Sequence, residues 1–131
     1  ISNKIREISE IIPITNIFYD RYNATQWVIQ MTEMGFTLTP FSQAIGNYNT
    51  CTKEFQRLVA NKEIIIQKSS NFVWQITCAT IKEDHNGNQK PIKTAWRTQK
   101  IDNIISSTTA LGGWLAEGGS SFDFEIFTIG G

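Results

Sequence analysis

The chain has 131 residues, an apolar fraction of 40% and four tryptophans, which exclude a disordered chain and indicate one globular domain or part of one. The formal net charge at pH 7 is zero, so overall charge does not attract the chain to nucleic acid, and any such binding requires a local basic patch. No apolar run reaches membrane-spanning length, and no signal-peptide pattern is present. Cys51 and Cys78 have neither metal-like spacing nor the density of a disulfide scaffold, so we expect reduced thiols in a cytosolic protein, with Cys78 packed in the core.

The first third of the chain alternates between helical and extended patterns. Isoleucines at helical spacing predict an amphipathic helix over residues 2–12, capped by Ser2 and ended by Pro13. The apolar run Ile17-Phe18-Tyr19 is typical of a strand buried on both faces, and we expect this strand to cover residues 14–19. A second helix, capped by Asn23 or Thr25, is expected to reach about residue 34, and residues 36–41 alternate like a short strand. This order favours a mostly parallel sheet with crossover helices.

The middle and end of the chain predict a loop over residues 42–50, then a helix to about residue 61 with Phe55, Leu58 and Val59 facing inward. Residues 64–66 read as a short buried strand or extended segment, and residues 72–80 as a helix. The Asn86-Gly87 turn predicts a protruding hairpin between residues 80–83 and 91–96. A helix over residues 100–115 ends the domain at about residue 117, and residues 118–131 are expected to be a Gly/Ser linker and a strand-like tail that pairs with another surface.

Asp20 follows the first predicted strand directly, and a helix begins soon after it. In open α/β sheets the carboxyl ends of the strands are where ligands bind, and a carboxylate there can reach both water and a metal. On local sequence alone a simpler interpretation is favoured by a modest margin, in which Asp20 ends the strand and caps the helix.

A second carboxylate, Asp102, opens the last predicted helix, where the helix dipole alone would give it a stabilising role of about 0.3–1 kcal/mol. Paired with Asp20 it would form an oxygen-rich site suited to Mg²⁺ or Mn²⁺. Four basic residues shortly precede Asp102, namely Lys90, Lys93, Arg97 and Lys100. Basic residues beside acidic metal ligands are what a phosphodiester-cleaving enzyme needs, because they hold the backbone phosphates. Their spacing alone favours a simpler interpretation, a solvated face of the hairpin. The sole histidine, His85, is expected in the hairpin turn as a solvated residue, and neither a nucleophile triad nor a phosphate-binding Gly-rich loop is readable.

A family resemblance extends over residues 17–115. The matching pieces are Tyr19-Asp20-Arg21-Tyr22-Asn23-Ala24, Met34-Gly35-Phe36, Ser42-Gln43, Lys53-Glu54-Phe55 with Leu58-Val59, Trp74, the run from Asp84 to Lys93, and Lys100-Ile101-Asp102-Asn103 followed by Ala110-Leu111. In order and spacing these pieces resemble the C-terminal nuclease domain of large terminase subunits from tailed bacteriophages. The resemblance implies an α/β, RNase H-like fold with a mixed sheet, flanking helices and the protruding hairpin.

The resemblance also implies a metal-dependent endonuclease that cuts concatemeric DNA during head packaging in the host cell cytoplasm. Asp20 and Asp102 match the family's metal-holding carboxylates of a two-metal cut with Mg²⁺ or Mn²⁺, and Asp84 is a weaker candidate for the same site. Lys93 matches a family lysine near the hairpin and is expected to contact double-stranded DNA, together with Lys90, Arg97 and Lys100. The implied protein partners are the portal protein and the small terminase subunit.

The chain departs from the family at several points. The first strand, which supplies a further metal-binding aspartate, and the ATPase motor have no counterpart here, so we expect a partial domain that cleaves weakly or not at all by itself. The exposed edge of the strand ending in Asp20 would then require an unseen covering segment or a second copy of the chain. Two alternatives stay open, a non-catalytic module that docks to DNA or to the portal, and, ranked last, an RNase H-like resolvase or integrase relative.

Overall fold

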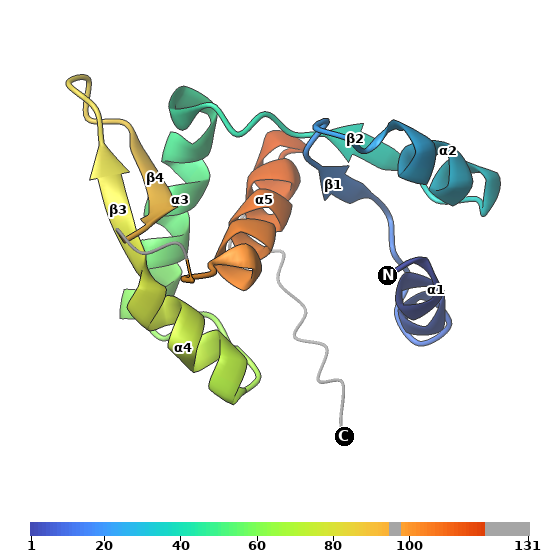
Figure 1. Cartoon of the computed structure of the whole chain (residues 1–131), viewed down its shortest axis with the longest axis horizontal. Helices are drawn as coiled ribbons and strands as arrows, with labels where there is room; N and C mark the ends of the chain where they lie inside the picture. The colour runs from blue at the N-terminus through green and yellow to red at the C-terminus, as the bar shows by residue number, and fades with distance from the viewer. Residues whose placement is uncertain (95–97, 120–131) are drawn as a thin grey trace.

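The computed structural model describes residues 1–94 and 98–119. The elements follow the order α1 (Ser2–Ser9), β1 (Ile17–Tyr19), α2 (Thr25–Glu33), β2 (Leu38–Pro40), α3 (Ile45–Ala60), α4 (Ser70–Cys78), β3 (Ala79–Glu83), β4 (Gln89–Lys93) and α5 (Asp102–Ala116). Figure 1 shows α3 and α5 side by side, with the β3–β4 hairpin on one side of them and β1, β2 and α2 on the other. No helix among the described residues has the length and apolar character needed to cross a membrane.

The strands of the described chain form two separate two-stranded sheets, so the sheet is smaller than the single mixed sheet that we expected. β1 and β2 are parallel, with Phe18 opposite Thr39, and α2 makes the crossover between them. The amide of Phe41 donates to the carbonyl of Tyr19 at 2.8 Å, which extends the pairing one residue past the end of β2. β3 and β4 are antiparallel and form the hairpin that the Asn86-Gly87 turn predicts, although β4 begins at Gln89 and not at Pro91.

The main core lies between α3 and α5, where Tyr48, Cys51, Leu58 and Leu111 are buried together with Phe41. The rings of Phe41 and Tyr48 pack edge to face with their centroids 5.7 Å apart, a favoured aromatic geometry. A second cluster joins α4 to the start of α5 and contains Cys78, as predicted, with Ile101 and Ile104. Both cysteines are free thiols in buried positions.

Two adjacent glycines allow α5 to approach β1 and the segment after β2. A Cβ atom on Gly113 would overlap the ring of Phe18, and one on Gly112 would overlap the ring of Phe41. The pair that weakens the end of a helix in isolation is therefore required by packing here. This close contact fixes the position of β1, and hence of Asp20, relative to α5.

Several predicted boundaries and caps are wrong. α1 ends at Ser9, before Pro13, and its N-cap is Ile1, with no side-chain capping bond from Ser2. β1 is shorter than residues 14–19, and α2 has Ala24 at its N-cap in place of Asn23 or Thr25. α2 buries Met31 without any side-chain cap, whereas α1 has no buried residue.

The segment between β2 and α4 differs most from expectation. α3 begins at Ile45, inside the predicted loop, because Tyr48 and Cys51 enter the core as the inward side of its first turns. Residues 64–66 form no strand, and Ile65 is 75% exposed. The predicted helix over residues 72–80 is confirmed as α4, and the hydroxyl of Ser69 caps it by accepting from the Phe72 amide at 3.0 Å. The linker and tail after residue 119, and the end of the predicted second hairpin strand from residue 95, lie outside the described residues.

Candidate active site

A cavity of about 530 Å³ opens where four parts of the chain meet: the end of β1, the segment after β2, the inner part of β4 and the first half of α5. Its polar and charged lining residues are Asp20, Gln43, Lys90, Lys93, Asp102, Ser106 and Thr109. Two predicted carboxylates and two predicted lysines thus share one cavity, although they are far apart in the sequence. We name it the charged cavity.

Asp20 follows β1 directly, at the carboxyl edge of the parallel pair, and is exposed. Its Oδ1 accepts a hydrogen bond from the amide of Tyr22 at 3.2 Å, so it organises the turn after the strand. It does not cap α2, which begins behind Ala24 without a side-chain bond. The simpler interpretation of Asp20 as a helix cap is therefore wrong, and its second carboxylate oxygen remains available to a ligand in the cavity.

Asp102 is the first residue of α5 and is exposed. The buried side chain of Gln75 on α4 holds the start of α5 in place, because its oxygen accepts a hydrogen bond from the Asn103 amide at 2.7 Å. That bond satisfies one of the free amides at the helix N-terminus and anchors α5 to α4. The carboxylate at this terminus is also stabilised by the helix dipole, as expected.

Lys90 is the half-buried cation of the cavity. Its ammonium donates to the backbone carbonyl of Gln43 and lies 5.1 Å from the centre of the Tyr48 ring. Burial lowers the pKa of Lys90, the charge of Asp20 raises it, and the neighbouring charge of Lys82 lowers it further. Lys93, three residues further along β4, lines the same cavity and is exposed.

A buried pair of hydroxyls lies behind this lysine. Tyr48 on α3 and Thr109 on α5 are hydrogen-bonded to each other, and both residues are buried. Burial raises the pKa of the Tyr48 phenol, while the bond to Thr109 partly opposes that effect. The pair joins the two core helices and supports the ring on which Lys90 rests.

The remaining predicted site residues lie elsewhere. Asp84 is in the hairpin turn, where its carboxylate accepts hydrogen bonds from the amides of Asn86 and Asn88 and from the side-chain amide of Asn88, at 2.8–3.0 Å. These bonds lower the pKa of Asp84, and the residue is not among those that line the charged cavity. Lys100 is exposed just before α5 and also does not line it, while Arg97 lies outside the described residues.

The donor set of the charged cavity fits a hard divalent cation. Asp20 and Asp102 offer oxygen atoms only, which suits Mg²⁺ or Mn²⁺ and not Zn²⁺. Neither carboxylate is held in an ion pair among residues 1–94 and 98–119. The same part of the chain contains no group of three or more metal-binding side chains.

Sequence patterns did not predict Gln43, Tyr48, Ser106 or Thr109 as part of this site. No sequence signal indicated Tyr48, because it lies in a segment predicted to be a loop. Ser106 and Thr109 could have been found, since they follow Asp102 by four and seven residues and therefore share its face of the helix.

The family comparison agrees with this geometry. The model of the family "terminase large subunit, endonuclease domain" matches residues 1–118. The chain belongs to this family. A search of curated proteins gave no match.

Among solved structures, the crystal structure of the HK97 bacteriophage large terminase is similar, with a TM-score of 0.74 and 20% sequence identity. The match covers 86% of this chain and 24% of that chain, so this chain spans about a quarter of the length of the terminase that it matches. The similarity shows that the fold is that of an RNase H-like terminase nuclease domain, as the sequence resemblance implied.

Proposed function

We propose that this chain is part of the metal-dependent endonuclease domain of a phage DNA-packaging terminase, which cuts concatemeric DNA by two-metal phosphodiester hydrolysis. One observation supports this above all: Asp20 and Asp102, at the end of β1 and the start of α5, line one cavity with Lys90 and Lys93. Terminase nuclease domains generally depend on divalent metals. In the proposed role the substrate is double-stranded DNA, and the protein partners in the host cytoplasm are the portal protein and the small terminase subunit.

In the proposed mechanism Asp20 and Asp102 would hold Mg²⁺ or Mn²⁺ through their carboxylate oxygens, and Asp84, which lies outside the cavity, would take no part. A metal ion bound there would supply Lewis-acid polarisation of a phosphodiester. Lys90 and Lys93 line the same cavity and would bind DNA phosphates beside the carboxylates, with Arg97 and Lys100 extending the contact along the backbone. The contacts of Lys90 with Gln43 and Tyr48 restrict its ammonium, which reduces the entropy lost when it binds phosphate.

A second candidate function is a non-catalytic module that docks to DNA or to the portal. It is favoured by one observation, namely that the described residues contain no cluster of three or more metal-binding side chains. Under either proposal we expect this chain by itself to cleave slowly or not at all.

The test is nicking of supercoiled plasmid by the chain in Mn²⁺, compared with the variants Asp20→Asn and Asp102→Asn. The matched control is Glu33→Gln, an exposed carboxylate at the end of α2 that does not line the cavity. Slow nicking that both aspartate variants abolish and the control retains would support the nuclease. Equal nicking by all four proteins would contradict the site, and DNA binding without any nicking would favour the docking module.

A further inference from the structure

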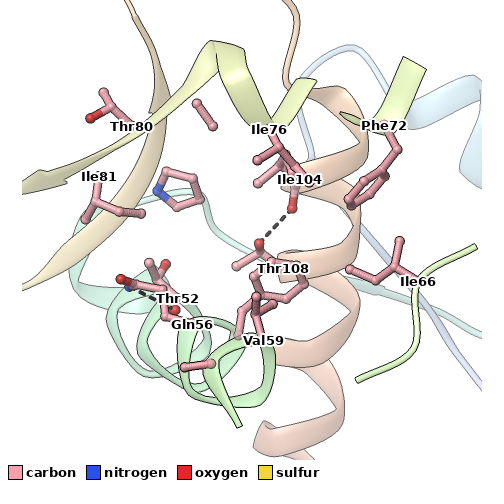
Figure 2. A pocket seen from close by; sticks show the side chains of 14 residues that line it. Thr52, Gln56, Val59, Ile66, Phe72, Ile76, Thr80, Ile81, Ile104 and Thr108 are labelled. Carbon is pink, nitrogen blue, oxygen red and sulfur yellow. Dashed lines mark hydrogen bonds between the residues drawn. The ribbon is translucent and has the colours of Figure 1, made fainter. Parts of the chain in front are cut away.

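A second cavity, of about 350 Å³, lies between α3, α4, α5 and β3, and Figure 2 shows its side chains converging on one space. Its lining is almost entirely apolar and includes Val59, Ile66, Phe72, Ile76, Ile81 and Ile104. We name it the apolar groove. Val59, Ile76 and Ile81 are 48%, 53% and 39% exposed, so large apolar side chains at its rim face solvent in the described part of the chain. Such a concentration of exposed apolar surface marks a place where another segment packs.

The groove also holds one polar atom without a partner. Thr52 is 2% exposed, and its hydroxyl has no hydrogen bond within the described structure. Its neighbours differ, because Thr108 donates to the Ile104 carbonyl and Gln56 donates to the Thr52 carbonyl, as Figure 2 shows. A buried hydroxyl left unpaired is unfavourable, but the Thr52 oxygen is closed off from solvent in the described structure, so an occupant of the groove would contact its apolar lining.

The wall made by β3 offers further backbone groups. β3 pairs with β4 on one side only, because their sheet has two strands. Thr80 and Ile81 on this strand line the groove. An extended segment could therefore add to the free edge of β3 while its side chains enter the groove, which is a common mode of peptide recognition.

The chain itself contains a segment that matches these requirements. Residues 122–127 alternate apolar Phe122, Phe124 and Ile126 with Asp123 and Glu125. Side chains in a strand point alternately to opposite faces, so the three apolar side chains would share one face and the two acids the other. The alternation thus suits a strand with one face against an apolar surface and one face in water.

The chain beyond α5 is long enough for residues 122–127 to reach the apolar groove. Gly119 is the last described residue, and Thr108, which lines the groove, lies about 12 Å before Ala116, the last residue of α5, at about 1.5 Å per residue. From Gly119, an extended chain to Ile126 spans about 24 Å at about 3.4 Å per residue. The middle of the segment can therefore lie over the groove without any change in α5.

We propose that residues 122–127 dock in the apolar groove of the same chain as an extended segment beside β3. Phe122, Phe124 and Ile126 enter the groove, and Asp123 and Glu125 stay in water. Pro91 lines both the groove and the charged cavity, so the docked segment would contact the strand that carries Lys90 and Lys93. The apolar groove would then serve to hold the hairpin in place beside the carboxylates.

The experiment is cysteine crosslinking in the full 131-residue chain, with Val59→Cys at the groove rim and Phe124→Cys in the segment. Both native thiols are at most 2% exposed, so they do not compete. Mild oxidation should give an intramolecular disulfide, identified by mass spectrometry, in at least fivefold higher yield than in two controls. The first control moves the second cysteine by one residue, with Val59→Cys and Glu125→Cys. The second replaces the groove position by Ile29→Cys on α2, which is 55% exposed.

Equal yields in all three proteins would overturn the proposal, because the segment would then have no preferred place or register. Disulfide-linked dimers at Val59→Cys and Phe124→Cys would also overturn it, since the groove would then receive the segment of a second copy. A second measurement compares hydrogen exchange in the parent chain and in Phe122→Ser/Phe124→Ser. Amides of β3 should exchange several-fold faster in the variant, and unchanged exchange would contradict docking beside that strand.

Discussion

The charged cavity and the apolar groove share Pro91 of β4 as a lining residue, yet they are built in different ways. The charged cavity takes its functional side chains from the ends of elements, with Asp20 after a strand and Asp102 at a helix start. The groove takes its lining from the middle of helices, where Val59 and Ile76 fit an apolar helical pattern but remain about half exposed. Asp20 and Asp102 are positioned by where β1 ends and α5 begins and by the packing of α5 on β1. Exposed apolar residues along a helix face, in contrast, indicate that the face is covered but not by what.

The largest effect is expected where the two core helices meet β1. In Gly113→Ala the new Cβ overlaps the ring of Phe18, which lines the charged cavity and not the groove. We expect a loss of about 2–3 kcal/mol in the free energy of unfolding by urea, because the core is overpacked. The control is Gly46→Ala near the start of α3, where nothing lies within 4 Å, and a gain of about 0.5 kcal/mol is expected. A Gly113→Ala chain as stable as the parent would contradict the close approach of α5 to β1.

The hydrogen bond between Tyr48 and Thr109 joins α3 to α5 beside Lys90. Tyr48→Phe leaves Thr109 without its partner in a buried site, and Thr109→Val does the same to Tyr48. Each should lower the free energy of unfolding by about 1–2 kcal/mol, and the double variant should cost less than the sum, since no unpaired hydroxyl then remains. Strictly additive losses would show that the two hydroxyls do not act as a pair.

The lysines of the charged cavity should affect DNA binding through phosphate contacts. Lys90→Met and Lys93→Met are each expected to reduce the slope of log affinity against log salt by about 1, equally for unrelated DNA sequences. Fluorescence anisotropy over a salt series measures this slope. Lys4→Met, which removes an exposed cation paired with Glu7 on α1, is the control and should leave it unchanged. An equal change in the control would remove the distinction between the cavity and the rest of the surface.

The smallest expected effect concerns Asp84 and acid. The pKa of Asp84 is lowered in the folded chain by the hydrogen bonds from Asn88 and Asn86. The stability that its carboxylate gives to the folded turn is therefore complete above the ordinary aspartate pKa and is lost as pH falls through the lower pKa of the folded chain. Amide exchange in the turn should therefore accelerate below about pH 4, and Asp84→Ala should remove that pH dependence. Unchanged protection of the turn amides in acid would contradict this role of Asp84.

Sequence patterns predicted the elements whose signals are local. The Asn86-Gly87 turn predicted the hairpin, and the apolar face with Asp102 in its first turn predicted α5. The start of α3 was missed because Tyr48 becomes apolar core only once α5 packs beside it. The prediction that Val59 faces inward is wrong, since its side chain is 48% exposed at the rim of the apolar groove. Asp20 and Asp102 were paired as a candidate site from their positions at element ends, and they line one cavity. The close approach of Gly113 to Phe18 that brings α5 to β1, however, has no local sequence signal.

The central proposal, that Asp20 and Asp102 share a metal site, is tested most directly by calorimetric titration of Mn²⁺ into the chain. The proposal predicts heat of binding for the parent chain, its loss in both Asp20→Asn and Asp102→Asn, and its retention in Glu33→Gln. Binding that survives in either aspartate variant with unchanged affinity would show that the two carboxylates do not act on the same ion, and would contradict the proposed site.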